Sequence, residues 1–317
     1  MLKQIIDTVL NNQSVKDKLK IYDTHNELGE TVTYKNPFNN DNPIKINIGD
    51  DCAAIPDENG GYLLFSAEGI ITTFLESSPW FAGYSAIMVN ISDVCSMGGL
   101  PLAVTDVIWL QDEAAGKEIW AGMKAASESY GVPIVGGHTC YRSEKKHLAV
   151  SILGKANNLL TSYDAEPGDI LLMAIDLNGN YFEQYPFWNA STTSTSKHLK
   201  NTMRLMHEIA DLKLSKSAKD ISMGGIIGTL GMLLNTSNVG ASIYLNQIPK
   251  PELISWEKWL VSFPSFGYLI TAKADKVETI KALFNTANIA CEAIGEINLQ
   301  KEIIVNYHEE KIIIPLK

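Results

Sequence analysis

Short apolar runs alternate with helical patterns along most of this 317-residue chain. Runs bounded by turn residues, such as residues 170–175 and 267–272, predict buried strands. Apolar residues spaced three and four positions apart predict helices over residues 80–98, 113–130, 197–211 and 275–287. Because strands and helices mix in both halves, the sequence predicts an α+β or α/β fold.

A polar stretch over residues 155–168 divides the chain. It leads into Pro167-Gly168-Asp169, which is a strong turn signal. A chain of this length is expected to form two domains, at about 100–200 residues per domain. We therefore expect an N-terminal domain over residues 1–158 and a C-terminal domain over residues 159–317.

The N-terminal segment carries a helical pattern and then a polar stretch. Residues 2–20 predict one or two amphipathic turns of helix, whereas residues 23–44 predict a loop. The N-terminus lacks the apolar core of a signal peptide, and no apolar run reaches the ~18 residues of a membrane span. We expect a cytoplasmic protein with no membrane partner.

The formal net charge of −10 limits the classes of partner. Nucleic acid is not expected, because phosphate backbones are bound by basic surfaces. ATP remains compatible with an acidic chain, since metal ions held by carboxylates can bind its phosphates. The four cysteines form no C-x-x-C pair, which favours buried, reduced thiols over a zinc site.

Two acidic positions follow strand-like runs. The first is Gly49-Asp50-Asp51, where adjacent carboxylates repel each other unless one is solvated or a cation lies nearby. The second is Glu68, at the end of the apolar run 62–66, where strand-end residues commonly form sites. The competing interpretation of each is a solvated acid with no function.

Asn90 and Asp93 lie three residues apart on an otherwise apolar predicted helix. A carboxylate buried there is costly without a partner, and a metal ion would meet that need. The alternative is that this helix face is solvated. The glycines Gly98 and Gly99 are interpreted as the end of the helix.

Two glycine pairs could approach phosphate. Gly136-Gly137-His138-Thr139 directly follows the predicted buried strand 132–135, so backbone N–H groups and the Thr139 hydroxyl could donate to phosphate. A tight turn with a packed histidine is the competing interpretation. The segment from Asp220 through Ser222 to Gly224-Gly225 is interpreted as a helix start, with Asp220 as its N-cap and as a possible metal ligand.

Motifs of the common nucleotide folds are absent. The sequence contains no P-loop, no dinucleotide-binding G-x-G-x-x-G after a strand, no protein-kinase H-R-D and no G-x-S-x-G elbow.

The order of the five segments is more specific than any one of them. The series G-D-D-x-A, S-x-E-G, N-x-S-D-x-x-x-M-G-G-x-P, G-G-H-T and D-I-S-x-G-G resembles the PurM-like superfamily. That superfamily includes aminoimidazole ribonucleotide synthetase, thiamine-monophosphate kinase, selenophosphate synthetase and the hydrogenase maturation dehydratase. Runs such as YGVPIVGGHT and AKDISMGGI are most similar to its AIR synthase-related branch.

The resemblance implies a fold, partners and cofactors. It implies an N-terminal α/β domain followed by a larger α+β domain, and a homodimer whose N-terminal sheets join into a barrel across the two-fold axis. It implies ATP in a cleft between the domains, with Mg²⁺ bridging phosphates and acids.

The resemblance also implies site residues. The expected metal ligands are Asp51, Asp93 and Asp220, with Asp50 and Glu68 as further acids. The expected catalytic residues are Asp51, Glu68 and Asp93. The expected nucleotide-binding residues are Asn90, Gly136, Gly137, His138, Thr139, Ser222, Gly224 and Gly225. Glu68 departs from the aspartate that many members carry, and His138 departs from the acid of thiamine-monophosphate kinase.

Three hypotheses follow. The first is an enzyme that transfers the γ-phosphoryl group of ATP to a small-molecule substrate, such as an amide or carboxamide oxygen. The second, motivated by Glu68, is a nucleotide-binding subunit or sensor without turnover. The third is a small-molecule-binding protein that takes no nucleotide.

Overall fold

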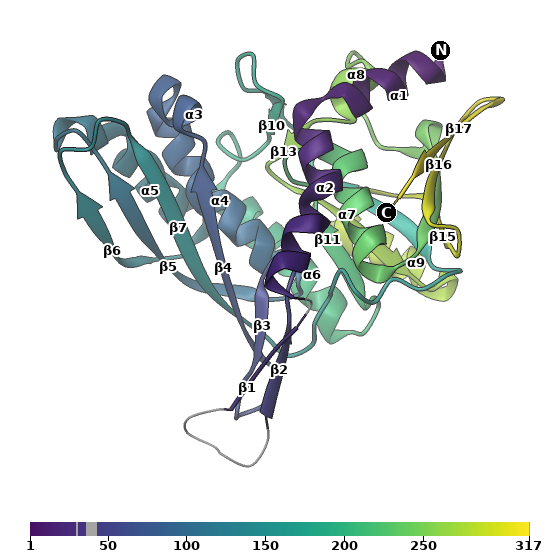
Figure 1. Cartoon of the computed structure of the whole chain (residues 1–317), viewed down its shortest axis with the longest axis horizontal. Coiled ribbons are helices and arrows are strands. Elements are labelled where there is room, and N and C mark those ends of the chain that lie inside the picture. Colours follow the sequence, from purple (N-terminus) through teal and green to yellow (C-terminus); the bar gives the residue numbers. More distant parts are fainter. Residues whose placement is uncertain (30, 36–42, 317) are drawn as a thin grey trace. The chain divides into compact units, whose positions relative to one another are not determined.

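The computed structural model describes residues 1–29, 31–35 and 43–316. The chain folds into two compact units (Figure 1). The seven-stranded unit comprises Met1–Asp50, Asn158–Thr193 and Glu208–Lys317. The five-stranded unit comprises Asp51–Asn157 and Ser194–His207. The predicted mixture of strands and helices in two parts is therefore confirmed.

The five-stranded unit is an open sheet with helices on one face (Figure 1). Its strands lie in the order β3-β4-β7-β5-β6, and β5 and β6 run parallel while the other pairs are antiparallel. The strands are β3 (Ala53–Pro56), β4 (Tyr62–Ile70), β5 (Leu100–Trp109), β6 (Ile134–Cys140) and β7 (His147–Ala156). The helices are α3 (Thr72–Ser77), α4 (Pro79–Ser96), α5 (Lys117–Tyr130) and most of α6 (Ser196–Asp211).

Helices α4 and α5 pack closely because each has a glycine at the contact. A Cβ on Gly83 would lie 2.2 Å from the Ile119 carbonyl oxygen, and one on Gly122 would lie 1.9 Å from that of Trp80. Helix α4 is buried along nearly its whole length, because it fills the space between α5 and strands β4 and β7. Helix α5 ends at Tyr130, as predicted, and Gly131 after it adopts a left-handed conformation with a φ of 72°.

The seven-stranded unit is a mixed sheet in the order β11-β14-β8-β15-β12-β16-β17. Its strands are β8 (Ile170–Ile175), β11 (Ser217–Asp220), β12 (Gly240–Tyr244), β14 (Gly267–Ala272), β15 (Ala290–Asn298), β16 (Glu302–Tyr307) and β17 (Glu310–Pro315). Its helices are α1 (Leu2–Asn11), α2 (Gln13–Leu28), α7 (Gly225–Ser237), α8 (Trp256–Trp259) and α9 (Val277–Thr286).

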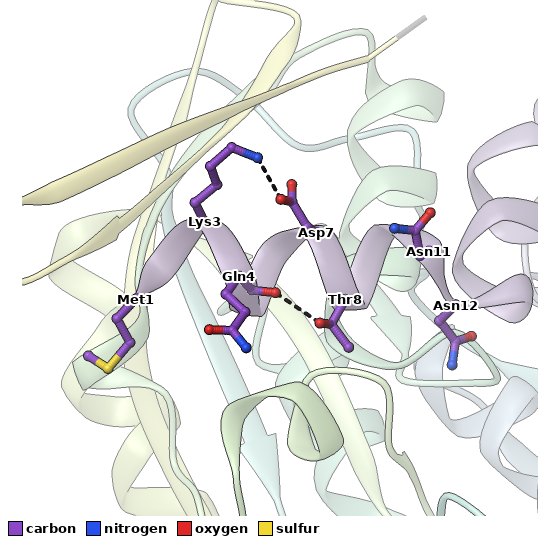
Figure 2. Close-up of a pocket in the computed structure, with 7 residues that line it drawn as sticks. All are labelled: Met1, Lys3, Gln4, Asp7, Thr8, Asn11 and Asn12. Atoms are coloured by element: carbon purple, nitrogen blue, oxygen red, sulfur yellow. Dashed lines mark hydrogen bonds and ion pairs between the residues drawn. The ribbon is translucent and has the colours of Figure 1, made fainter.

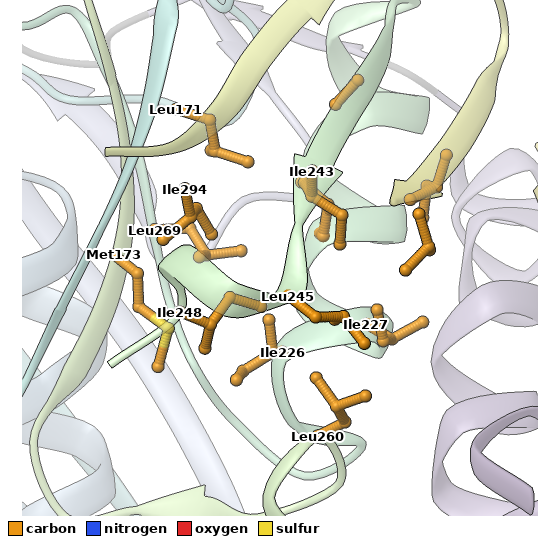
Figure 3. Packing of buried hydrophobic residues seen from close by; sticks show 14 of the residues in the cluster. Leu171, Met173, Ile226, Ile227, Ile243, Leu245, Ile248, Leu260, Leu269 and Ile294 are labelled. Atoms are coloured by element: carbon orange, nitrogen blue, oxygen red, sulfur yellow. The ribbon is translucent and has the colours of Figure 1, made fainter. Parts of the chain in front are cut away.

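The main core of this unit lies between the sheet and helices α1 and α7. Figure 3 shows Ile226 and Ile227 of α7 together with Leu171, Met173 and Leu269 of the central strands. Strand β8 alternates between this cluster and its other face, and both sets of side chains are buried. Such two-sided burial explains why β8 reads as a continuous apolar run.

The predicted loop over residues 23–44 is wrong over much of its length. Helix α2 continues to Leu28, and strands β1 (Thr31–Lys35) and β2 (Pro43–Asn47) form an antiparallel pair. Residues 36–42 lie outside the described part of the chain. Helix α2 packs against α7, where glycines leave room for it: a Cβ on Gly231 would lie 2.3 Å from Leu19 Cδ2.

Three other local predictions need correction. The buried strand predicted over residues 132–135 instead begins at Ile134 and extends through Cys140 as β6. This edge strand is exposed over residues 135–139. The predicted loop over 178–195 contains two short strands, β9 (Asn180–Tyr181) and β10 (Phe187–Asn189), which form a small sheet with β13 (Phe263–Pro264). The helix predicted to open at Asp220 begins at Gly225, since Asp220 ends β11.

The prediction of buried, reduced thiols is confirmed for three of the four cysteines. No cysteine forms a disulfide within the described residues, and Cys52, Cys95 and Cys291 are buried, whereas Cys140 is partly exposed. Burial raises the pKa of the Cys291 thiol to about 12, so this group stays protonated at neutral pH. Among the described helices, we find none that is both long and apolar enough to cross a membrane.

Candidate functional site

The two adjacent aspartates of the Gly49-Asp50-Asp51 turn have different partners. Gly49 adopts a φ of 112°, a conformation that favours glycine and turns the chain sharply. Asp50 Oδ2 accepts a hydrogen bond of 2.8 Å from the Ser162 backbone N–H. Asp51 Oδ2 accepts one of 2.7 Å from the buried Ser96 hydroxyl. Asp50 thus anchors a loop, whereas Asp51 points to helix α4.

Asp93 lies on α4 and meets Asp51. The Asp93 side chain is buried, and its Oδ2 accepts a 2.9 Å hydrogen bond from the Ser66 hydroxyl of β4. A carboxylate oxygen of Asp51 and one of Asp93 lie within 4.8 Å of each other. Two carboxylates at this distance repel each other. A divalent cation bound between them would replace this repulsion by a net attraction. The solvated-face interpretation of Asp93 is therefore wrong.

Asn90 lies one helical turn before Asp93 and is completely buried. Its Nδ2 donates to the Ala86 carbonyl at 2.8 Å. Its Oδ1 has no hydrogen-bond partner within the described residues. A buried oxygen without a donor is costly, and a bound cation or water would satisfy it. Hard oxygen atoms from carboxylates and an amide are the ligand type that Mg²⁺ prefers, so this donor set fits that ion.

Glu68 is exposed and lies within β4 rather than beyond its end. Ser66 and Glu68 are two residues apart, so their side chains leave the strand on the same face, about 7 Å apart along it. Because Ser66 contacts Asp93 of α4, Glu68 also lies on the helix-covered face of the sheet.

Gly136, Gly137, His138 and Thr139 belong to β6, and they do not form a loop. The register pairs Gly137 with Asp106 and His138 with Val107, so neighbouring residues point to opposite faces. Gly137 and Thr139 lie on the face that carries Ser66, whereas Gly136 and His138 lie on the other face. The structure thus separates His138 from the two residues that flank it.

Asp106 is a polar residue of this sheet that sequence reasoning missed. Its side chain is half-buried in the layer between the sheet and the helices, and burial raises its pKa above the ordinary value of 3.8. A Cβ on Gly137 would lie 2.5 Å from Asp106 Oδ2 and 2.6 Å from the Asp106 carbonyl oxygen. The signal was available, since Asp106 is the one acid within the apolar run 100–110.

Asp220, Ser222, Gly224 and Gly225 belong to the seven-stranded unit. Asp220 is buried and pairs with Tyr268 of β14, so it does not cap α7. Two amides at the start of α7 already donate within the chain: Gly225 N–H to the Ser222 carbonyl and Ile226 N–H to the Leu260 carbonyl. These donors are less available to a phosphate than the sequence suggested.

A hollow of about 700 Å³ follows one side of helix α1 (Figure 2). Its lining side chains interact with one another along the helix, as in the Lys3–Asp7 ion pair. The hollow contains none of the predicted site residues. All of the lining residues lie on or beside this one helix, so polar side chains do not converge on the hollow from several elements.

Two family models match the chain. The AIR synthase related protein N-terminal domain matches residues 49–156, and the corresponding C-terminal domain matches residues 166–308. An uncharacterized protein of Methanocaldococcus jannaschii is 34% identical over 99% of this chain and 96% of its own length. An uncharacterized protein of Synechocystis is 45% identical over 80% of this chain and 78% of its own length.

Enzymes appear among the more distant relatives. Thiamine-monophosphate kinase of Buchnera aphidicola is 27% identical over 86% of this chain and 90% of its own length. The structure of Thermotoga maritima PurL complexed with ATP has a TM-score of 0.72 at 19% identity. It covers 83% of this chain, but this chain spans only 45% of PurL.

A structure of AaThiL complexed with AMPPCP and TMP has a TM-score of 0.65 at 22% identity, covering 83% of this chain and 90% of AaThiL. Both structural likenesses show a shared fold. Together with the two uncharacterized relatives and the two family models, they confirm the resemblance on which the sequence interpretation depended. The chain belongs to the AIR synthase related family of the PurM-like superfamily.

Proposed function

We propose that this protein binds ATP with Mg²⁺ and transfers the γ-phosphoryl group to a small-molecule acceptor. The observation that carries the proposal is the Asp51–Asp93 pair, whose carboxylate oxygens lie within 4.8 Å of each other on a buried framework. A divalent cation bound between two such carboxylates would offset their mutual repulsion. A kinase among the relatives and a structural neighbour complexed with ATP support the nucleotide.

Asp51, Asp93 and the Asn90 amide oxygen would hold the ion, with Glu68 and Asp220 as further acids. When bound, Mg²⁺ neutralises the phosphate charge that develops during transfer. Gly137 and Thr139 would bind on the phosphate side from β6. Gly136 and His138 lie on the other face of this strand, which is turned away from Asp93. Ser222, Gly224 and Gly225 are proposed as further nucleotide contacts.

The acceptor class is a carboxamide or another group that carries a dissociable proton. In the transfer, an acceptor oxygen forms a bond to the γ-phosphorus, the bond from that phosphorus to the β–γ bridging oxygen breaks, and ADP leaves with the electron pair. The acceptor loses one proton to solvent or to a carboxylate. Placement of the reactants and neutralisation of charge supply most of the acceleration in such reactions.

A thermal-shift titration with AMPPCP tests the binding step. With Mg²⁺, nucleotide at about 100 times its Kd raises the free energy of unfolding by about 2.7 kcal/mol, and the melting temperature rises accordingly. Asp51→Asn or Asp93→Asn is expected to weaken the affinity by about 100-fold, whereas the exposed control Asp275→Asn is expected to leave it unchanged. An unchanged affinity in both site variants would show that the metal assignment is wrong.

Turnover is measured separately, as ADP release with a panel of carboxamides, amines and alcohols. Acceptor-dependent release of ADP that disappears in Asp93→Asn is the expected result. Tight binding of Mg-AMPPCP with no ADP release across the panel would contradict phosphoryl transfer while leaving nucleotide binding in place.

We also propose a homodimer formed through the face of the five-stranded sheet opposite to α4. Apolar side chains are exposed on this face: Phe65 is 50% exposed, its cross-strand neighbour Leu153 is 39% exposed, and Trp109 is 37% exposed. The sheet is open, with β3 and β6 as its edges, so a second copy could extend it towards a barrel.

A further inference from the structure

Two serine hydroxyls hold the carboxylates of Asp51 and Asp93. Ser96 Oγ lies 2.7 Å from Asp51 Oδ2, and Ser66 Oγ lies 2.9 Å from Asp93 Oδ2. Ser96 is completely buried on α4, and Ser66 is half-buried on β4. Each carboxylate is thus bound through its Oδ2 to a hydroxyl on a helix or strand of the same unit.

Ser96 has two acceptors within reach of its single proton. Its Oγ lies 2.7 Å from Asp51 Oδ2 and 2.7 Å from the Asp93 carbonyl oxygen. The carbonyl contact, three residues back along the helix, is common for helical serines. The bond to an ionised carboxylate is charge-assisted and therefore the stronger of the two. Ser96 consequently ties the turn that carries Asp51 to the helix that carries Asp93.

We propose that Ser96 and Ser66 are positioning residues that make this carboxylate pair select Mg²⁺ over Ca²⁺. The inference rests on the proposed Mg-ATP site. A carboxylate that accepts a hydroxyl proton on one oxygen meets a cation most readily through the other oxygen. Monodentate carboxylates at a fixed separation suit the small octahedral Mg²⁺, whereas Ca²⁺ favours bidentate carboxylates and a larger, adaptable shell.

The hydroxyls of Ser66 and Ser96 orient the two carboxylates as well as filling space. Alanine at either position would fill nearly the same volume, but it would remove the hydroxyl that occupies Oδ2 and so make that oxygen available to a cation. The partners of a ligand commonly change metal affinity by about 10- to 100-fold when they are removed. Loss of a serine should therefore weaken Mg²⁺ binding while changing Ca²⁺ binding little.

The test is calorimetric titration of Mg²⁺ and of Ca²⁺ into the full-length protein saturated with AMPPCP. Ser96→Ala and Ser66→Ala are each expected to weaken the Mg²⁺ affinity by about 10-fold and to lower the Mg²⁺/Ca²⁺ affinity ratio by a similar factor. Ser96→Thr, which keeps the hydroxyl, is expected to restore most of the ratio. Ser85→Ala, a change at another buried serine of α4, serves as the matched control.

The outcomes separate this inference from the proposed function. In one outcome, Asp51→Asn abolishes Mg²⁺ binding, but both serine variants keep the wild-type ratio of Mg²⁺ to Ca²⁺ affinity. The metal site is then supported, and the positioning role of the serines is wrong. If Asp51→Asn leaves the Mg²⁺ affinity unchanged, both proposals are wrong. Ser66 is half-buried, so its variant remains informative even if Ser96→Ala lowers the melting temperature.

Discussion

At the scale of single residues, Gly137 has a packing role in addition to the phosphate contact that its motif suggests. The motif suggested that Gly137 lets backbone amides approach a phosphate. In the structure, the space beside Gly137 is occupied by the side chain and carbonyl of Asp106 on the neighbouring strand. Gly136, its sequence neighbour, has nothing within 4 Å of the position of a Cβ. The two glycines therefore differ in how much space surrounds them.

Gly137→Ala is expected to destabilise the five-stranded unit, and Gly136→Ala is not. A Cβ at 2.6 Å from the Asp106 carbonyl oxygen forces the backbone of β5 or β6 to move, at a cost of about 1–3 kcal/mol. Urea unfolding of both variants measures the difference. Equal free energies of unfolding for the two alanine variants would contradict this account of Gly137.

Asp106 is expected to make the stability of the fold depend on pH. Its folded-state pKa is raised by burial, so the folded chain holds the proton more tightly than the unfolded chain does. Its contribution to stability is therefore present at acidic pH and is lost as the pH rises through the raised folded-state pKa.

Asp106→Asn removes this penalty of ionisation. Relative to the wild type, the variant should gain melting temperature at pH 7 and gain less near pH 4, close to the ordinary pKa of 3.8. Thermal unfolding at the two pH values provides the measurement. A difference between variant and wild type that is the same at both would show that Asp106 titrates normally.

At the scale of elements, helix α7 begins under tight steric constraint. Gly225 has a φ of 63°, and a Cβ there would lie 2.4 Å from the Leu260 carbonyl oxygen. Further along the helix, a Cβ on Gly228 would first meet Lys18 Cβ, at 3.3 Å. The first residue of α7 is thus held against the backbone near Leu260, whereas Gly228, three residues later, faces a side chain of α2.

Gly225→Ala is expected to cost about 2–4 kcal/mol, from backbone strain together with the steric clash. Gly228→Ala is expected to be neutral or to stabilise by up to ~1 kcal/mol, because alanine favours the helix interior. Denaturant unfolding of the two single variants compares them directly. If Gly225→Ala proved as stable as Gly228→Ala, the first turn of α7 would be less constrained than its geometry indicates.

At the scale of the whole molecule, the exposed apolar face of the five-stranded sheet predicts self-association. Glutamate at Phe65 and Leu153 together would place two charges within the proposed interface, which should convert dimers to monomers in sedimentation-velocity measurements. Leu299→Glu, at a site 78% exposed in the seven-stranded unit, should leave the sedimentation coefficient unchanged. If the wild-type protein sedimented as a monomer, the proposed homodimer and the barrel between its two five-stranded sheets would be wrong.

The sequence by itself determined the types of most elements and the family. Helix and strand periodicity is a local property, so α4, α5, α6 and α9 could be predicted from spacing alone. The order of five short motifs identified the superfamily, because order survives where individual motifs are weak. Polar composition misled the interpretation of residues 23–44, where tertiary packing of α2 on α7 and the pairing of β1 with β2 override local preference.

Only the tertiary structure decided which partners surround the site. Ser96 and Asp51 are separated by 45 residues, and Ser66 and Asp93 by 27, so no local pattern connects them. The same holds for Asp106 and Gly137, which meet only because β5 and β6 pair in a particular register. Helix and strand periodicity depends on residues that are close in the sequence. Whether a carboxylate is solvated or hydrogen-bonded within the protein depends on residues that are distant in the sequence and meet only in the folded chain.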